Sequence, residues 1–299
     1  MRELSARGLS VREEASVRAR ARTNSFHGRP LPPGLVSFSS REGKRRFGEA
    51  LADGQCEAFF PLSEQFITQD EPAFCGLSSL CMVLNALCVD PGPTRPAWRE
   101  DGVWRWFDER VLALDAPLLR DNGKRTLDQI QTDGVTLDEF SALASRNGAL
   151  TTQRRPADSS LAQFREQIIQ SASSPTAPHM VVSFCRGTLQ QTGDGHFSPI
   201  AGYHMESDSV LVLDVARFKY PPYWVSVSTL WDAMAPVDEV TGDSRGYVLL
   251  RAEATCPMWD RWKLEQDKTA QLDVCIMDLP SHPMDRAASS SRLLAAEVC

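Results

Sequence analysis

One cysteine in this chain has the sequence surroundings of a nucleophile. Cys75 follows a Pro-containing turn and opens an apolar run that extends to Leu87. Apolar residues at helical spacing predict a helix with one face packed inward, and these are Leu77, Leu80, Cys81, Leu84 and Cys88. At a helix N-terminus, unpaired backbone N–H groups and the helix dipole favour a thiolate. Cys75 is therefore a candidate nucleophile, with a buried structural cysteine as the ordinary alternative.

A glutamine lies six residues before this cysteine, on the loop that leads into the predicted helix. The side-chain amide of Gln69 is a donor of the kind that stabilises an oxyanion in acyl transfer. A glutamine and a helix-start cysteine form half of such a site. The other half requires a general base and a group that orients the base.

The residues that can complete the site are His196 and Asp214. His196 follows a glycine-rich turn at the start of a predicted strand, and Asp214 lies eighteen residues further on, at the end of the next strand. Consecutive antiparallel strands bring the start of one beside the end of the other. His196 can then face Cys75 while Asp214 accepts a hydrogen bond from the other ring nitrogen. A lone histidine is more often structural, so the prediction depends on all three residues meeting.

The elements that must position these residues change in character near residue 175. Before it, helices are predicted at 39–52, 75–87, 138–148 and 159–169. After it, strands are predicted at 179–184, 196–200, 210–215 and 246–250. The expected fold class is α+β, with three or four antiparallel strands. The helical N-terminal half carries the cysteine, the antiparallel half carries the histidine and aspartate, and the active-site groove lies between them.

Composition excludes several classes of protein. The chain has 299 residues, of which 42% are hydrophobic and 24% charged, as in a soluble globular protein. A net charge of −7 argues against nucleic-acid binding, which requires a basic face. No apolar run approaches the ~20 residues of a membrane span, and the N-terminus lacks the apolar region of a secretory signal. We therefore expect no nucleic acid or membrane partner and a cytoplasmic location.

The eight cysteines are scattered, without a Cys-x-x-Cys pair or a histidine at zinc-finger spacing. The lack of an export signal predicts thiols that are mostly reduced, and the scattered spacing predicts no protein metal site. A cysteine-rich metal-binding protein without catalysis is disfavoured for the same reason.

The two ends of the chain differ from its middle. Residues 1–33 are expected to form a disordered basic and Pro-rich arm, with an organelle transit peptide as the alternative. Residues 34–252 form the predicted catalytic domain, and 253–299 a short variable tail that is partly disordered. Trp98, Trp104, Trp106 and Phe107 cluster within the catalytic domain, where they line a ligand cleft or pack in the core.

Four segments carry a resemblance to a known family. They read EPAFCGL at 71–77, WRWFDE at 104–109, QTGDGHFSPI at 191–200 and LDVARFKYPP at 213–222. Together they strongly resemble the phytochelatin synthase family, over roughly residues 36–250. By motif match, Cys75 is the nucleophile, His196 the base, Asp214 the orienting residue and Gln69 the oxyanion donor. The order Gln, Cys, His, Asp is the papain-like order.

The resemblance implies a papain-like fold and a glutathione γ-glutamylcysteinyltransferase that acts in heavy-metal detoxification. Cys75 would take the γ-glutamylcysteinyl group of glutathione as a thioester and release glycine. A second glutathione or a phytochelatin would then accept the group. No cofactor is expected to be tightly bound, since Cd, Zn or Cu ions would enter as metal–glutathione thiolates, as substrate or activator.

Two basic residues follow the aspartate in the fourth motif. Arg217 and Lys219 are candidates for binding the carboxylates of glutathione, and a surface ion pair is the alternative for each. The partners implied are glutathione and phytochelatins, and a homodimer is left open. A glutathione or glutathione-conjugate hydrolase is the alternative function, because both reactions share the acyl-enzyme.

The chain also departs from the family pattern. Phe74 stands where plant members usually have Tyr, and Asp194 replaces a Thr beside the predicted base. The segment 112–117 lacks the adjacent cysteines that plant members carry after the Trp-rich motif, and we expect no counterpart of their long cysteine-rich C-terminal domain in residues 253–299. These departures leave the predicted catalytic residues untouched and imply a weaker response to metal.

Overall fold

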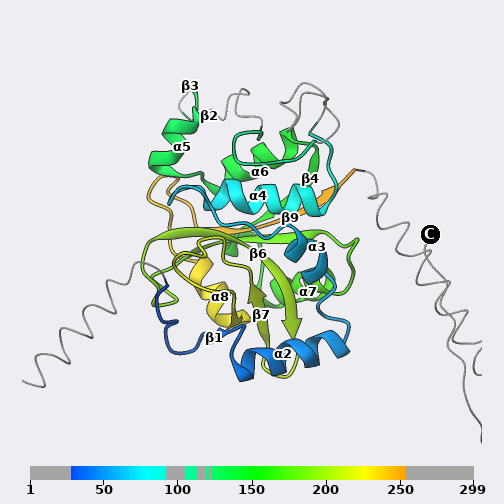
Figure 1. Ribbon diagram of the computed structural model, residues 1–299. Helices are drawn as coiled ribbons and strands as arrows, with labels where there is room; N and C mark the ends of the chain where they lie inside the picture. The colour runs from blue at the N-terminus through cyan, green and yellow to red at the C-terminus, as the bar shows by residue number, and fades with distance from the viewer. Residues whose placement is uncertain (1–27, 92–104, 113–118, 121–122, 254–299) are drawn as a thin grey trace, which may run out of the picture. The chain divides into compact units, whose positions relative to one another are not determined.

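A seven-stranded antiparallel sheet is the framework of this computed structural model, which describes residues 28–91, 105–112, 119–120 and 123–253 (Figure 1). The strand order is β1-β8-β7-β6-β5-β9-β4. The strands are β1 (Val36–Ser37), β4 (Ala149–Arg154), β5 (His179–Cys185), β6 (Gly195–His204), β7 (Ser209–Val212), β8 (Tyr223–Ser226) and β9 (Gly246–Ala252). A separate hairpin pairs β2 (Leu119–Arg120) with β3 (Gly123–Lys124). The combination of helices with an antiparallel sheet confirms the α+β class.

Most of the helices begin where the sequence supplies a capping side chain. They are α2 (Arg41–Ala52), α3 (Phe59–Glu64), α4 (Cys75–Ala86), α5 (Leu127–Asp133), α6 (Leu137–Arg146), α7 (Leu161–Ala172) and α8 (Val227–Met234), with a 3₁₀ turn at Pro156–Asp158. Five of them start after a Ser or Thr whose hydroxyl accepts a backbone N–H: Ser40, Thr126, Thr136, Ser160 and Ser226. All four predicted helices are confirmed. In the part of the chain described, no helix is long and apolar enough to cross a membrane.

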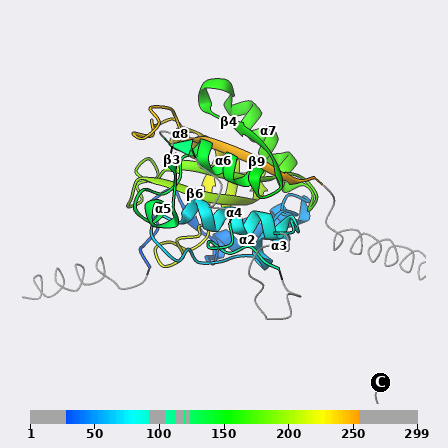
Figure 2. The same ribbon diagram turned by 90° about the horizontal axis from the view of Figure 1, so that it is seen from above.

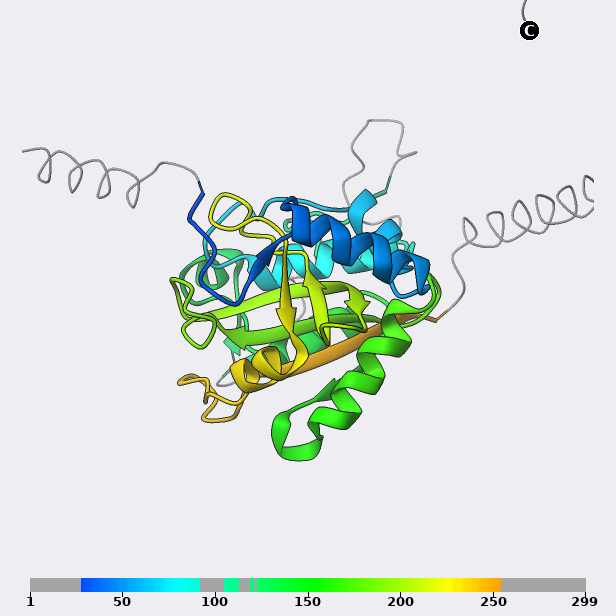
Figure 3. The same ribbon diagram turned by 90° about the horizontal axis from the view of Figure 1, so that it is seen from below.

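The sheet is buried on both faces. Helices α4 and α6 lie over one face (Figure 2), and α7 and α8 pack on the opposite face (Figure 3). Each face of the sheet has its own hydrophobic core, and alternate residues of β5 point into one or the other. Val181 packs in the core with α4, whereas Met180 and Val182 pack in the core with α7 and α8. Burial on both faces explains why the central strands read as nearly continuous apolar runs.

The first half of the chain is mainly helical, as expected, but it also supplies two strands to the sheet. β4 pairs with β9, from Ala149 opposite Ala252 to Arg154 opposite Tyr247, and β1 pairs with β8. The sequence predicted three or four strands because β1 and β8 are short and the polar residues of β4 conceal its strand pattern. The two halves are therefore joined through one sheet.

Helix α4 is buried on every side rather than on one face. Asn85 is the one residue in it that is not buried. The prediction of a single inward face was therefore wrong, because α4 packs against the sheet, α3 and α6 together. Cys88 lies beyond the helix, where it is exposed, has a φ of 54° and is disulfide-bonded. Free thiols in the described ranges are Cys56, Cys75, Cys81 and Cys185.

The predicted aromatic cluster is described in part. Phe107 is buried in the core, and Asn85 binds its backbone N–H and carbonyl at 3.0 and 2.9 Å. Trp106 is exposed, while Trp98 and Trp104 lie outside the described residues. For Phe107, the core-packing alternative is confirmed.

His179, at the start of β5, is fully buried and neither of its ring nitrogens has a hydrogen-bond partner. Burial therefore lowers the pKa of His179 to about 4. The unfolded chain, with an ordinary histidine pKa, binds a proton between about pH 6.5 and pH 4 that the folded chain does not bind. Folding stability must then fall as the pH falls through this window.

We predict that His179→Leu loses less stability on acidification than the wild type. Urea unfolding at pH 7 and pH 4.5 measures the free energy of unfolding of both proteins. The loss between the two pH values should be smaller in the variant by about 2–3 kcal/mol, because the titrating group is gone. Equal losses would show that His179 is not the source of acid sensitivity.

Candidate active site

Cys75 is the first residue of α4, and its thiol is hydrogen-bonded to His196. Burial alone would raise the pKa of this thiol. The positive charge of His196, its hydrogen bond and the backbone N–H of Phe197 outweigh burial and hold the pKa of Cys75 below its usual value. The helix-start position predicted for the nucleophile is confirmed, and the surroundings favour a thiolate.

His196 is the second residue of β6, and its Nε2 lies 2.9 Å from Oδ1 of Asp214. Burial would lower the pKa of His196, but the charge of Asp214 raises it above its ordinary value. Burial opposes ionisation of Asp214 too, yet His196 and Arg186 lower the pKa of that carboxyl to about 2. The structure thus brings together Cys75, His196 and Asp214 in an arrangement that favours a thiolate beside an imidazolium.

Asp214 lies beyond the strand that was expected to contain it. β7 ends at Val212, and the Asp214 Oδ1 accepts the backbone N–H of Ala216 at 2.9 Å, as in a tight turn. This bond and full burial fix the carboxylate against the imidazole. The strand boundary was wrong by a few residues, but the predicted pairing of Asp214 with His196 is present.

Packing between α4 and β6 sets the position of Cys75 relative to His196. The backbone of Phe197 is bound from two sides, since its N–H meets the Cys75 thiol and its carbonyl accepts Ser79 Oγ at 3.2 Å. The ring of Phe140 stacks on Phe197 with a centroid distance of 5.1 Å. A Cβ at Gly76 would collide with the side chain of Val135, so glycine at this position lets the start of α4 pack closely against the α5–α6 turn.

Arg186 is a residue of this site that the sequence did not reveal. It follows β5, is 3% exposed, and its Nη2 lies 2.9 Å from both carboxylate oxygens of Asp214. Its guanidinium also stands 5.2 Å from the centroid of the Tyr220 ring. The arginine keeps Asp214 ionised while opposing protonation of His196. Nothing local marks it in the sequence, because its partner is 28 residues away.

Gln69 is buried on the loop before Cys75, but its amide is occupied by main-chain carbonyls. Nε2 donates to the Glu71 and Pro72 carbonyls at 2.8 and 2.9 Å, and the backbone N–H donates to Val215 at 3.0 Å. The side chain thereby shapes the turn into α4. Its role as oxyanion donor stays a prediction, which requires the amide to exchange one carbonyl for the oxyanion.

A cavity of about 300 Å³ opens beside the Cys75 thiol. Its lining comprises Pro72, Ala73, Cys75, residues 132–136, Ser183, Asp194, Gly195, Phe197, Asp238, Val240 and Arg245. The volume is at the lower end of the range of small-ligand sites. Strand β6, the start of α4 and the α5–α6 turn therefore enclose one space around the thiol.

Arg245 is the buried cation of this cavity, at 4% exposure. Its Nη1 donates to the carbonyls of Pro236 and Val237 at 3.1 Å, and its Nη2 donates to Asp194 Oδ1 at 3.1 Å. Asp194, which departs from the family pattern, thus has its charge paired on the cavity wall. Sequence analysis did not single out Arg245, which lies just before β9 and outside the four motifs.

The α5–α6 turn on the cavity wall is fixed by Arg125. This buried guanidinium donates to the carbonyls of Gly134 and Gln129 at 2.8 and 3.0 Å and pairs with Glu139 at 3.1 Å. The three contacts join the end of α5 and the turn itself to Glu139 in α6, so they fix the turn relative to α6. Residues 132–136 therefore present a preformed wall to the cavity.

Arg217 and Lys219 do not line the cavity. Arg217 is exposed, with its guanidinium 4.7 Å from the centroid of the Phe66 ring. Lys219 is half-buried near Gly193, and burial together with the charges of Arg186 and Arg29 lowers its pKa. Both therefore lie outside the pocket beside the thiol, and their role in substrate binding stays a prediction.

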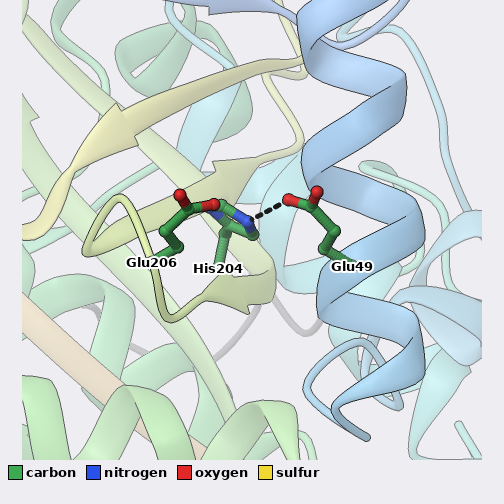
Figure 4. A group of neighbouring side chains, drawn as sticks. All are labelled: Glu49, His204 and Glu206. Atoms are coloured by element: carbon green, nitrogen blue, oxygen red, sulfur yellow. Dashed lines mark hydrogen bonds and ion pairs between the residues drawn. The ribbon is translucent and has the colours of Figure 1, made fainter.

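A second cluster of titratable residues lies away from this site. Glu49, His204 and Glu206 place potential ligand atoms within 4.8 Å of one another (Figure 4). Arg45 already pairs with Glu49 at 2.6 Å and with Glu206 at 3.2 Å, while His204 Nε2 is bonded to Glu49 at 2.8 Å. The arginine supplies the cation that these carboxylates need, so the cluster serves to hold α2 against the turn after β6.

Comparison with known proteins agrees with the geometry. A family model described as phytochelatin synthase matches residues 26–247. Relatives named glutathione gamma-glutamylcysteinyltransferase include one from Schizosaccharomyces pombe, 46% identical over 226 residues (76% of this chain, 51% of the relative). Another, from Triticum aestivum, is 47% identical over 234 residues (78% of this chain, 44% of the relative). The chain spans about half the length of the curated relatives it matches. It belongs to the phytochelatin synthase family.

Proposed function

We propose that this chain is a phytochelatin synthase with a papain-like catalytic domain, which transfers γ-glutamylcysteine from glutathione to glutathione or to a phytochelatin. The observation that carries the proposal is a thiol of lowered pKa, paired with His196, that opens onto a cavity containing a buried guanidinium. The names of the relatives support the choice of glutathione as donor. We place the reaction in the cytoplasm.

The first half-reaction forms a thioester on Cys75. The thiolate attacks the carbonyl carbon that joins Cys to Gly in glutathione, and the carbonyl oxygen becomes an oxyanion. His196, as imidazolium, donates its proton to the nitrogen of the departing glycine as the C–N bond breaks. Asp214 keeps the imidazole oriented and stabilises its charged form. The products are free glycine and a γ-glutamylcysteinyl thioester.

The second half-reaction transfers this acyl group to an amine. The α-amine of a second glutathione, or of a phytochelatin, attacks the thioester carbon, and neutral His196 takes the proton that the amine loses. The C–S bond breaks, and the thiolate returns beside the imidazolium. No bound cofactor is required, because His196 supplies a proton in the first half-reaction and recovers one in the second.

The cavity offers a complement to the γ-glutamyl end of glutathione, which carries an α-carboxylate and an α-ammonium. Arginine carries more N–H donors than the three bonds that Arg245 makes to protein, so a ligand carboxylate can be bound bidentately. Asp238, on the same lining, can receive the ammonium. Arg245 and Asp238 are therefore our candidates for binding the donor glutathione.

The acceptor is assigned to Arg217 and Lys219, which lie just beyond Asp214 in the sequence. An acceptor held there would place its amine near the thioester, where proximity offsets the large excess of water. Heavy-metal ions enter as part of the substrate, in the form of metal–glutathione thiolates. A hydrolase would use water in place of the acceptor amine and is the alternative.

We predict that the full chain, incubated with glutathione and Cd²⁺, makes γ-glutamylcysteine oligomers that end in Gly and releases free glycine. The yield without added metal should be far lower, because the metal caps the thiol of the substrate. Mass spectrometry of the products is the measurement. Cys75→Ser is the control and should release no glycine while remaining folded.

Two results would count against this reading. γ-Glutamylcysteine and glycine as sole products, with metal and at every glutathione concentration, would identify a hydrolase. Wild-type glycine release by Cys75→Ser would mean that Cys75 is not the nucleophile.

The charge of Asp214 leads to a separate prediction. Asp214→Asn keeps a hydrogen-bond acceptor for His196 but loses the carboxylate that raises its pKa. The imidazolium then loses its proton at lower pH, so the alkaline limb of the pH–rate profile should move to lower pH. The rate loss should be smaller than in His196→Ala, for which about 10²–10⁴ is expected when a general base is removed. A profile with an unmoved alkaline limb would contradict the role of Asp214.

A further inference from the structure

Glu109 is a buried carboxyl that neither half-reaction uses. It lies in the WRWFDE segment and is 5% exposed. Its Oε1 accepts two hydrogen bonds, one from the hydroxyl of Ser78 and one from the backbone N–H of Asp70 at 3.2 Å. Burying a carboxyl group costs folding free energy unless the group is hydrogen-bonded. We therefore asked what the hydrogen bonds of Glu109 hold together.

The two donors belong to the two segments that meet at the nucleophile. Asp70 directly follows Gln69 on the loop that leads into α4, and Ser78 lies in the first turn of α4, three residues after Cys75. Ser78 also donates to the carbonyl of Phe74, the residue before the nucleophile. A single oxygen of Glu109 thus joins the start of the Gln69–Cys75 loop to the helix at its end.

The segment that carries Glu109 is itself anchored to α4 at a second place. Asn85, near the C-terminal end of that helix, binds both backbone groups of Phe107. Asp108 closes the following turn by accepting the N–H groups of Arg110 and Val111 at 2.9 and 2.7 Å. The segment therefore contacts α4 at two separate places, through Phe107 near the C-terminal end of the helix and through the Glu109 side chain at Ser78, near Cys75.

We infer that Glu109 is a positioning residue, which holds the Gln69 loop in register with Cys75 so that the acyl carbonyl meets both the thiol and the oxyanion donor. The inference rests on the proposed function. It predicts that the acceptor oxygen matters rather than the negative charge, because both bonds are received by Oε1. It also predicts that the thiol keeps its reactivity without Glu109, since its own partners are His196 and Phe197.

The test compares Glu109→Ala and Glu109→Gln with Asn85→Ala, which removes the distal anchor of the same segment. In the full chain, glycine release at varied glutathione gives kcat and KM, urea unfolding gives stability, and alkylation by iodoacetamide gives the reactivity of Cys75. Glu109→Ala should lower kcat by about 10- to 100-fold, as expected for a misplaced reacting group. KM and the alkylation rate should change little. Glu109→Gln should restore most of kcat, because its amide oxygen accepts the same bonds.

Asn85→Ala should lower stability while leaving kcat close to the wild-type value. If Glu109→Ala does not fold, Ser78→Ala, which removes one of the two donors, takes its place with the same expected pattern. A loss of kcat in Asn85→Ala as large as that in Glu109→Ala, at matched stability, would make Glu109 merely structural and overturn the inference. Failure of Glu109→Gln to restore kcat would also overturn it. Failure of the proposed function is distinguishable in the wild type, which would then release no glycine or, as a hydrolase, would release glycine without forming γ-glutamylcysteine oligomers.

Discussion

The hydrogen bond between His196 and Asp214 is the interaction on which the rest of the site depends. Both side chains are buried, and burial alone would favour a neutral thiol, a neutral imidazole and a protonated carboxyl. The 2.9 Å bond reverses each of these preferences, because the charge of Asp214 raises the pKa of His196, and the charge of His196 lowers that of Cys75. Arg186 pairs with Asp214 and keeps this carboxylate ionised, so the charge that raises the pKa of His196 is maintained.

These three charged groups can interact because two elements from distant parts of the sequence pack against each other. Helix α4 brings Cys75, and strand β6 brings His196. Ser79 binds the backbone of Phe197 in β6, and Gly76 lets the start of α4 pack closely against Val135 of the α5–α6 turn. The same packing leaves the cavity beside the thiol, walled by the turn that Arg125 fixes. The position of the thiol and the cavity beside it thus both follow from the packing of α4 and the α5–α6 turn against the sheet.

Sequence reasoning predicted the residues whose roles depend on local pattern. Cys75 was found because a helix start is visible in hydrophobic spacing, and His196 because it follows a glycine turn at a strand start. Arg186, Arg245 and Glu109 were not assigned roles, since their partners lie far away in the sequence and no spacing rule connects them. Strand β4 was missed because polar residues follow its first two positions on both faces, and α4 looked amphipathic although its surroundings bury it on all sides. Contacts between residues far apart in the sequence could not be predicted, because local spacing does not report them.

The central claim is that Cys75 carries the acyl group. The most direct measurement is to quench the full chain in acid during turnover of glutathione, digest it and locate the adduct by mass spectrometry. The account predicts one γ-glutamylcysteinyl group, labile to hydroxylamine as a thioester is, on the peptide that contains Cys75. The adduct on another cysteine, or glycine release with no acyl-enzyme under conditions where thioesters survive, would contradict it.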